Sequence, residues 1–169
     1  MEEILEIVDG KNRVTCTGRR SVIHEKGLKH RSSVLFIFNG KNEMLLGKRA
    51  KGKDMFPGRW SFPVAGHLKP GESPEASVCR ECKEELGVET NAEYVTLLPP
   101  SKENGNHFLY VYKATTGKRL SGFRFNREEF SSLKFLSMKD LKKSISENEG
   151  RFSPAFIEAF RELDRKKII

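Results

Sequence analysis

The chain lacks the marks of a membrane-spanning or secreted protein. No apolar run in its 169 residues approaches the roughly 20 residues that a membrane-spanning helix requires. The opening residues Met1-Glu2-Glu3-Ile4 are acidic and have neither the basic nor the apolar region of a signal peptide. Only three cysteines occur, Cys16, Cys79 and Cys82, and this odd, sparse set argues against a disulfide framework. We therefore expect a cytoplasmic protein with no membrane partner.

The chain also has fewer acidic than basic residues. The chain has 23 Asp and Glu against 31 Lys and Arg, so its formal net charge is +8 and we expect anionic partners. Phosphorylated small molecules and RNA would both satisfy that charge. No stretch combines aromatic and basic side chains in the manner of proteins that read single strands, so we do not expect a nucleic-acid partner. The content of 37% hydrophobic and 32% charged residues is typical of a soluble globular protein, most simply one domain over residues 1–169.

One short helix is strongly marked in the middle of the chain. Ser73 can cap the free amides of a first turn, Pro74 suits the first helical position, and Gly87 supplies a left-handed stop. These signals predict a helix over about residues 74–86, preceded by a glycine-bounded loop that begins at Gly66. At 100° per residue, the side expected to face the core carries Ala76, Val78, Cys79, Cys82 and Leu86. The Cys-x-x-Cys spacing in this set is that of half a zinc site, but there is no second pair, so we expect core residues.

The other side of the same helix gathers three carboxylates, those of Glu81, Glu84 and Glu85. Like charges at these spacings repel one another, so the arrangement makes most sense if a cation lies over them. Carboxylate oxygens suit Mg²⁺ or Mn²⁺, and proteins often hold Mg²⁺ with a few carboxylates plus the phosphates of a substrate. Arg80 precedes Glu84 by one turn and can hold it in place. A solvated acidic face is the simpler alternative, and the helix on its own leaves it open.

Strands dominate the rest of the chain. Residues 3–8 and 13–17 alternate in character around a turn signal at residues 9–12, which predicts an N-terminal β-hairpin. The near-continuous apolar run at residues 33–38 is typical of a strand buried on both faces. Further strands are expected at residues 43–49, 92–98, 107–114 and 130–136, and helices at residues 138–146 and from residue 154 onward. This order predicts an α+β fold, an α/β/α sandwich over a mixed sheet.

Basic residues gather at the end of the strand expected at residues 43–49 and in the Pro- and Gly-containing loop expected at residues 56–63, ahead of the marked helix. Lys48, Arg49 and Arg59 lie near it in sequence and are candidate contacts for phosphate groups. Arg49 is the foremost of them, because a guanidinium can hold two phosphate oxygens at once. Surface charge that only aids solubility is the alternative for each of the three.

The stretch from Gly66 to Val88 resembles the Nudix box, Gly-x5-Glu-x7-Arg-Glu-U-x-Glu-Glu-x-Gly-U, where U is a bulky aliphatic residue. The matching residues are Gly66, Glu72, Arg80, Glu81, Glu84, Glu85, Gly87 and Val88, and only Cys82 departs from the pattern. The resemblance implies the sandwich fold and a metal-dependent pyrophosphohydrolase. It also implies that Mg²⁺ or Mn²⁺ is bound by Glu81, Glu84, Glu85 and the backbone carbonyl of Ala65. Glu72 and Arg80 would then support the loop and the helix.

A wider frame resembles the branch of Nudix proteins related to isopentenyl diphosphate isomerase. The residues that carry it are His30-Arg31, Gly47-Lys48-Arg49-Ala50, Lys53, Phe56-Pro57-Gly58-Arg59-Trp60 and Ala65-Gly66-His67. Isomerases of that branch work with a cysteine just before the box and with additional His and Glu metal ligands. This chain has Phe62-Pro63-Val64-Ala65 before Gly66, so that cysteine is missing. The resemblance therefore implies common ancestry with the isomerases without their reaction.

The histidines of this chain only partly follow the isomerase pattern. His24, His30 and His67 remain, whereas His107 stands where an acidic residue is expected. Imidazole suits transition metals, so these histidines can form a metal site. The alternative is that each serves as a hydrogen-bonding or structural residue, and the sequence leaves both open.

We expect hydrolysis of a diphosphate bond in a nucleoside diphosphate derivative or another organic diphosphate. Divalent ions would neutralise phosphate oxygens and lower the pKa of the attacking water. We expect Glu81 or Glu84 to take the proton of this water. The resemblance implies, as the alternative, an acidic residue from a later loop, where Glu129 or Glu128 matches. We also expect Arg80 to belong to the catalytic set. An isomerase-like enzyme and a nucleotide- or RNA-binding module without turnover stay open as alternatives. The partner is a phosphorylated small molecule, and the chain is expected to be a monomer or a homodimer.

Overall fold

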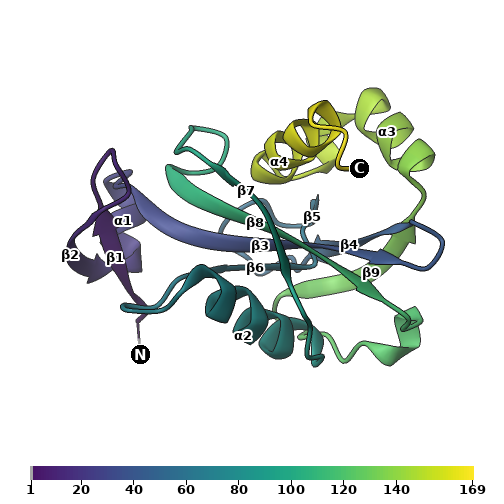
Figure 1. Cartoon of the computed structure of the whole chain (residues 1–169), viewed down its shortest axis with the longest axis horizontal. Helices are drawn as coiled ribbons and strands as arrows, with labels where there is room; N and C mark the ends of the chain where they lie inside the picture. Colours follow the sequence, from purple (N-terminus) through teal and green to yellow (C-terminus); the bar gives the residue numbers. More distant parts are fainter. Residues whose placement is uncertain (1) are drawn as a thin grey trace.

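A sheet with helices on both faces and a small hairpin at one end make up the protein, as Figure 1 shows. The computed structural model describes residues 2–169, so Met1, which opens the acidic N-terminal stretch, lies outside the described residues. The helices are α1 (Arg20–Glu25), α2 (Pro74–Leu86), α3 (Met138–Glu147) and α4 (Pro154–Arg165), and η1 (Leu120–Gly122) and η2 (Glu149–Arg151) are 3₁₀ turns. None of the helices within residues 2–169 is long and apolar enough to span a bilayer.

The middle layer is a mixed sheet of seven strands. Its members are β3 (His30–Asn39), β4 (Met44–Arg49), β5 (Trp60–Ser61), β6 (Val64–His67), β7 (Glu93–Leu98), β8 (His107–Thr116) and β9 (Phe130–Leu136). The central strand β3 pairs in parallel with β8 and antiparallel with β6. β7 continues the sheet beyond β8, and β9 and β5 pair with β4. This is the mixed sheet that the sequence predicts.

Two apolar cores lie on the two faces of this sheet. Successive residues of β3 alternate between them, with Val34, Phe36 and Phe38 in one core and Leu35 and Ile37 in the other. A strand that faces a core on both sides is apolar at consecutive positions, which explains the uninterrupted run in the sequence.

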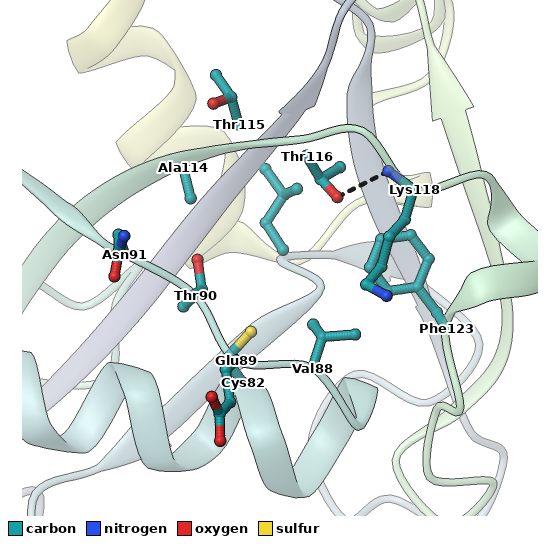
Figure 2. Close-up of a pocket in the computed structure, with 11 residues that line it drawn as sticks. Cys82, Val88, Glu89, Thr90, Asn91, Ala114, Thr115, Thr116, Lys118 and Phe123 are labelled. Carbon is teal, nitrogen blue, oxygen red and sulfur yellow. Dashed lines mark hydrogen bonds between the residues drawn. The ribbon is translucent and has the colours of Figure 1, made fainter.

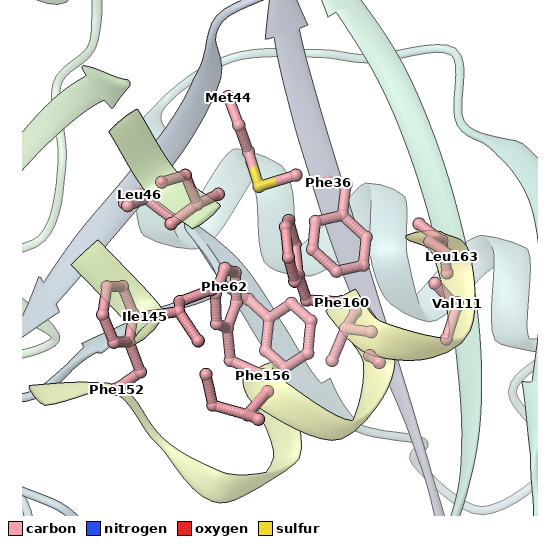
Figure 3. Packing of buried hydrophobic residues seen from close by; sticks show 14 of the residues in the cluster. Phe36, Met44, Leu46, Phe62, Val111, Ile145, Phe152, Phe156, Phe160 and Leu163 are labelled. Atoms are coloured by element: carbon pink, nitrogen blue, oxygen red, sulfur yellow. The ribbon is translucent and has the colours of Figure 1, made fainter. Parts of the chain in front are cut away.

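The larger core lies between the sheet and the helices α3 and α4. Figure 3 shows the aromatic rings that fill it, with Phe156 of α4 in the middle. The ring centroid of Phe156 lies 5.8 Å from that of Phe36 and 5.4 Å from that of Phe62, distances at which aromatic pairs attract one another. The smaller core lies under α2, whose buried residues include Val78, Cys82 and Leu86. α2 is thereby fixed against the sheet.

The N-terminal hairpin of β1 (Ile4–Val8) and β2 (Val14–Arg19) packs beside the start of α2. The two strands pair antiparallel, as the sequence predicts. Glu6 accepts a hydrogen bond from the backbone N–H of Gly71 at 2.9 Å and forms an ion pair with Arg31. These contacts join the hairpin both to the loop before α2 and to β3, so it lies next to the residues of the predicted site.

Some short elements differ from the sequence-based expectation. The sequence predicts a loop over residues 56–63 and another from Gly66, yet Trp60–Ser61 form β5, and Gly66 and His67 belong to β6. Strands of two and four residues are too short to show an alternating pattern, and they exist because β4 and β3 pair with them. Ala76 was expected in the core but is exposed. Its place on the buried side is taken by Ser77, whose hydroxyl accepts a hydrogen bond from that of Ser33.

Candidate active site and metal centre

α2 begins and ends where the sequence predicts. The Ser73 hydroxyl accepts a hydrogen bond from the N–H of Ala76 at 3.1 Å, and Pro74 occupies the first turn. Gly87 ends the helix with φ of 68°, a left-handed conformation that residues with a side chain adopt only under strain. β6 runs into the loop before this helix, so the last residues of the strand lie against the first turns of α2.

Arg80 ties the acidic residues of the site together. Its guanidinium donates to both carboxylate oxygens of Glu72, at 2.8 and 2.9 Å, and to Glu81 at 2.6 Å and Glu84 at 3.2 Å. A further bond at 3.2 Å reaches the backbone carbonyl of His67. The hydrogen bond from Arg80 lowers the pKa of Glu72. Arg80 therefore fixes the loop, the helix and β6 relative to one another; the resemblance implies a supporting role of this kind for Arg80 and Glu72.

The three predicted metal-binding carboxylates differ in exposure. Glu85 is only 6% exposed, and its Oε2 accepts a hydrogen bond of 3.0 Å from the N–H of Ala65. Glu81 lies against Gly66, so closely that a Cβ there would come within 2.1 Å of its carboxyl carbon. Glu84 is half exposed at the edge of the site. The structure thus brings Glu81 and Glu85 onto β6 beside Ala65, instead of leaving them on an exposed acidic face.

Burial makes the two inner carboxyl groups, those of Glu81 and Glu85, harder to ionise. The pKa of Glu85 is raised well above its usual range by burial and then by the charge of Glu81, and burial also raises the pKa of Glu81. Two carboxyl groups in such surroundings are ionised together only if positive charge compensates them. Arg80 contacts Glu81, and the hydrogen-bond partner of Glu85 is a neutral amide. A divalent cation with oxygen ligands fits this donor set.

The predicted phosphate-binding residues separate onto two faces of the sheet. Arg49 faces α2, where Glu129 and Glu85 are among the charges that act on it, and its Nε donates to the carbonyl of Met55 at 2.8 Å. Lys48 points the other way, with its ammonium 5.8 Å from the centre of the Trp60 ring. Adjacent residues of a strand point to opposite faces of the sheet, so Lys48 and Arg49 cannot both contact a phosphate group on the α2 side.

Arg59 lies with Lys48 rather than with Arg49. Its guanidinium stands over the ring of Phe56, 5.3 Å from the centroid, and donates a 3.4 Å hydrogen bond to the carbonyl of Phe152. Phe152 belongs to the core under α3 and α4. Among the three basic candidates, Arg49 is therefore the one that lies beside the carboxylates.

The loop before β9 brings Glu129 to the site. The N–H of Asn126 donates to the carbonyl of Glu85 at 2.8 Å, which fixes this loop to the end of α2. The carboxylate of Glu129 forms an ion pair with Lys53 at 2.8 Å and is among the charges that raise the pKa of Glu85. Glu128, the other candidate base in this loop, is exposed. The geometry favours Glu129 over Glu128 as the nearer acidic group.

All four histidines of the chain meet beside the carboxylates. One ring nitrogen from each of His24, His30, His67 and His107 lies within 4.8 Å of the others. The sequence indicates the first three as candidate metal ligands. It marks His107 only as a residue that stands where the isomerase pattern has an acidic residue. Burial lowers the pKa of His24 to about 4 and that of His30 to about 3, so these rings are neutral at pH 7 and their lone pairs are available. This group, hereafter the histidine cluster, fits a transition metal.

Cys79 is half-buried and Cys82 is buried on the sheet side of α2. Cys82 is fully buried in the smaller core, and burial raises the pKa of its thiol to about 12. Figure 2 shows it among the residues that line a pocket, together with residues 88–91, the end of β8 and Phe123. The lining of this pocket includes none of the predicted metal-binding residues.

Replacing Cys82 by valine should leave turnover and metal content nearly unchanged. The substitution exchanges one small apolar side chain for another in a core position and restores the aliphatic type that the box pattern expects. Metal analysis and steady-state rates of the two proteins, measured side by side, check this expectation. Loss of stoichiometric zinc in Cys82→Val would contradict the assignment of this cysteine to the core.

The chain is similar to known proteins along most of its length. The family model of the NUDIX domain matches residues 28–156. A prenyl-diphosphate phosphatase from Methanosarcina mazei is 28% identical over 130 residues, 76% of each chain. Isopentenyl-diphosphate Delta-isomerase 1 from Photorhabdus laumondii is 30% identical over 166 residues, which cover 92% of this chain and 91% of the relative. The crystal structure of DR0079 from Deinococcus radiodurans has the same fold, with a TM-score of 0.75 at 23% identity, covering 86% of this chain and 90% of that one.

Proposed function

The chain belongs to the NUDIX family, and from that premise we propose that it hydrolyses a diphosphate bond of an organic diphosphate with the help of Mg²⁺ or Mn²⁺. The observation that carries the proposal is the position of Glu85, which is 6% exposed, bonded to the N–H of Ala65 and next to Glu81. A buried carboxylate beside a second carboxylate is costly unless a cation compensates it. The intact set of box residues also argues against a binding module that has lost turnover.

Each residue of the site has a definite task in this reaction. Glu81, Glu84, Glu85 and the carbonyl of Ala65 would hold the cation, which when bound neutralises phosphate oxygens and lowers the pKa of the attacking water. Arg80 keeps Glu81 and Glu84 in place through its hydrogen bonds.

Arg49 and Glu129 complete the proposed site from the other side. Arg49 can bind the phosphate group that leaves, since a guanidinium offers two donors in one plane. Glu129 takes the proton of the attacking water, and its ion pair with Lys53 fixes the direction of its carboxylate. Lys48 and Arg59 face the α4 side of the sheet, so we propose that they contact the part of the substrate remote from the reacting phosphate.

The substrate class follows from the relatives and from the charge of the chain. The similarity to a prenyl-diphosphate phosphatase makes prenyl diphosphates candidate substrates, beside the nucleoside diphosphate derivatives that the box suggests. Both offer the anionic diphosphate that a chain of net charge +8 attracts. A panel of nucleoside di- and triphosphates, dinucleotides, and isopentenyl and longer prenyl diphosphates, each with Mg²⁺ or Mn²⁺, distinguishes the two classes.

Similarity to the isomerases raises a second candidate reaction, the interconversion of isopentenyl and dimethylallyl diphosphate. That reaction delivers a proton to one carbon of an alkene and removes one elsewhere, so it needs side chains that exchange protons. Val64 is fully buried in the core under α2, and Ala65 has only a methyl group. His107 in place of an acid changes the charge of that region as well.

We therefore expect hydrolysis without isomerisation. In ¹⁸O-labelled water, a true substrate should yield a phosphate product that contains one labelled oxygen, detected by mass spectrometry. Isopentenyl diphosphate should give no dimethylallyl diphosphate above a control without enzyme. Isomerised product with no phosphate released from any diphosphate in the panel would contradict the proposal, and binding without any turnover would favour the non-catalytic module.

A further inference from the structure

A half-buried tryptophan on the α4 side of the sheet has two lysines over its ring. Trp60 lies opposite Lys48 in the pairing of β5 with β4, and its side chain packs against the core under α3 and α4. The ammonium of Lys134, in β9, lies 4.0 Å from the centre of the Trp60 ring, and that of Lys48 lies 5.8 Å from it. Two cations therefore share one aromatic side chain, whose face attracts positive charge.

A third cation joins these two lysines from the segment between α3 and α4. Arg151 ends η2, and the next residue, Phe152, forms a β-bridge with Trp60. The N–H of Ser153 also donates to the carbonyl of Trp60 at 2.9 Å, which fixes the end of η2 beside β5. The members of this group, hereafter the Trp60 cluster, are Lys48, Trp60, Lys134 and Arg151.

Among residues 2–169, no carboxylate forms an ion pair with any of these three cations. Burial lowers the pKa of Lys134, and the charges of Arg151 and Lys48 lower it further. Glu149, the acidic residue nearest to Arg151 in sequence, pairs with Arg161 instead. Like charges held close together repel one another, and a bound anion with more than one negative charge would offset this repulsion.

The chemistry of the Trp60 cluster favours a phosphate group over an apolar ligand. An apolar chain on this surface would take ammonium groups out of water without giving them a partner, which costs free energy. A terminal phosphate group carries a charge of about −1.5 to −2 at pH 7 and has three strong acceptor oxygens, so it can bind ammonium and guanidinium groups together. A planar base is less well suited, because the Lys134 ammonium already lies over the Trp60 ring.

We propose that the Trp60 cluster is an anion site that binds a terminal phosphate group through Lys48, Lys134 and Arg151. This inference rests on the proposed function in one respect, since Lys48 is assigned above to the part of the substrate remote from the reacting phosphate. That part then carries a second phosphate group. A substrate of this kind is a phosphorylated nucleoside diphosphate derivative and not a prenyl diphosphate, whose remote part is a hydrocarbon chain.

Trp60 gives a direct readout of binding, because it is the only tryptophan of the chain. In EDTA, which withholds divalent cations and prevents turnover, inorganic diphosphate should change the intrinsic fluorescence as it draws the ammonium of Lys134 away from the ring. Binding should saturate, and it should weaken as salt is added, since the contacts join charges near the surface. Lys134→Gln and Arg151→Gln should each weaken binding by roughly 10-fold, and titration calorimetry measures the same affinities without the fluorescence.

Two control variants separate this site from the rest of the chain. Lys102→Gln removes one positive charge from an exposed position in the loop between β7 and β8, and Glu84→Gln alters the proposed cation site. Both should bind inorganic diphosphate in EDTA as the wild type does. Because Glu84→Gln should lose hydrolysis and keep this binding, the anion site and the proposed hydrolysis can fail independently.

A matched pair of ligands tests the assignment to the substrate. NAD⁺ and NADP⁺ each contain a diphosphate bond and differ only in one phosphate group on a ribose. In EDTA the wild type should bind NADP⁺ roughly 10-fold more tightly than NAD⁺, and Lys134→Gln should remove most of this difference. Equal binding of the two, with inorganic diphosphate still bound, would overturn the substrate assignment and leave the site to a separate phosphorylated molecule.

Two results would overturn the Trp60 cluster as an anion site altogether. One is the absence of any binding of inorganic diphosphate by the wild type, measured by calorimetry as well as by fluorescence. The other is an affinity that Lys134→Gln and Arg151→Gln leave unchanged, since the diphosphate would then be bound elsewhere on the chain.

Discussion

Glu85→Gln should lower the rate of hydrolysis by roughly 10²–10³-fold while the protein stays folded. The amide keeps the size of the side chain and can still accept the hydrogen bond from Ala65, but it removes a negative charge beside Glu81. Glu84→Gln should have an effect of the same order, because it also removes a proposed cation ligand. Treatment with EDTA should abolish turnover in the wild type, and Mg²⁺ or Mn²⁺ should restore it. Steady-state rates over a range of metal concentrations measure these effects.

The stability of the cation-free protein should respond in the opposite sense. Because the pKa of Glu85 is raised in the folded state, the unfolded chain loses this proton first as the pH rises, so ionisation of Glu85 destabilises the fold above the ordinary glutamate range. Glutamine cannot ionise, so Glu85→Gln should keep or raise the Tm at pH 7 when no cation is present. A thermal melt with EDTA tests this directly.

Glu75→Gln is the matched control for these two variants. Glu75 lies in the first turn of the same helix, is exposed, and takes no part in the proposed site. Its substitution should leave the rate unchanged. Full activity in Glu84→Gln or Glu85→Gln would remove that residue from the catalytic site, whatever the control shows.

The sequence predicts α2 well because its signals are local. Ser73, Pro74 and Gly87 set the ends of the helix within a few residues, and the helical period places the three carboxylates on one arc. It does not predict that Glu85 is buried while Glu84 stays half exposed. That difference depends on β6, which lies against the helix through pairing with β3. The burial of Glu85 therefore depends on β6, and the sequence of α2 does not specify where β6 lies.

The histidine cluster shows the same limit more sharply. His30, His67 and His107 are far apart in the chain. Only the resemblance to the isomerase branch marks His24, His30 and His67 as candidate metal ligands, and His107 stands where that pattern expects an acid. The parallel register of β3 and β8 sets His30 opposite His107, and a sequence without a known register cannot give this pairing. One signal was available, since both residues open apolar strands that become neighbours once the sheet order is known.

The sequence alone separates two of the basic candidates. Lys48 and Arg49 are consecutive residues of a predicted strand, and consecutive strand residues point to opposite faces. The alternation alone therefore separates them, as the structure does by placing Lys48 over Trp60 and Arg49 toward Glu129. Which of the two faces the carboxylates still required the position of α2.

Gly66→Ala should abolish most of the activity with only a modest loss of stability. A Cβ at this position would come within 2.1 Å of the carboxyl carbon and Oε1 of Glu81, so the Glu81 side chain must leave its place. The atoms that clash are the end of a flexible side chain, and the backbone pairing of Gly66 with Ser33 can persist. We expect a cost of about 1–3 kcal/mol in the free energy of unfolding, as for other overpacked sites.

The expected loss of turnover follows from the contacts of Glu81 with Arg80 and with the proposed cation. Displacing it breaks its 2.6 Å contact with Arg80 and moves a proposed cation ligand by more than an ångström, a displacement that can cost about 100-fold in rate. Gly40→Ala is the matched control, because its Cβ would meet no described atom within 4 Å apart from those of Gly40 and its two chain neighbours. Rates and thermal melts of both variants should show a loss confined to Gly66→Ala and to catalysis. If Gly66→Ala remained fully active, Glu81 would act from another position, and the arrangement of carboxylates on β6 would not be the one that hydrolyses the substrate.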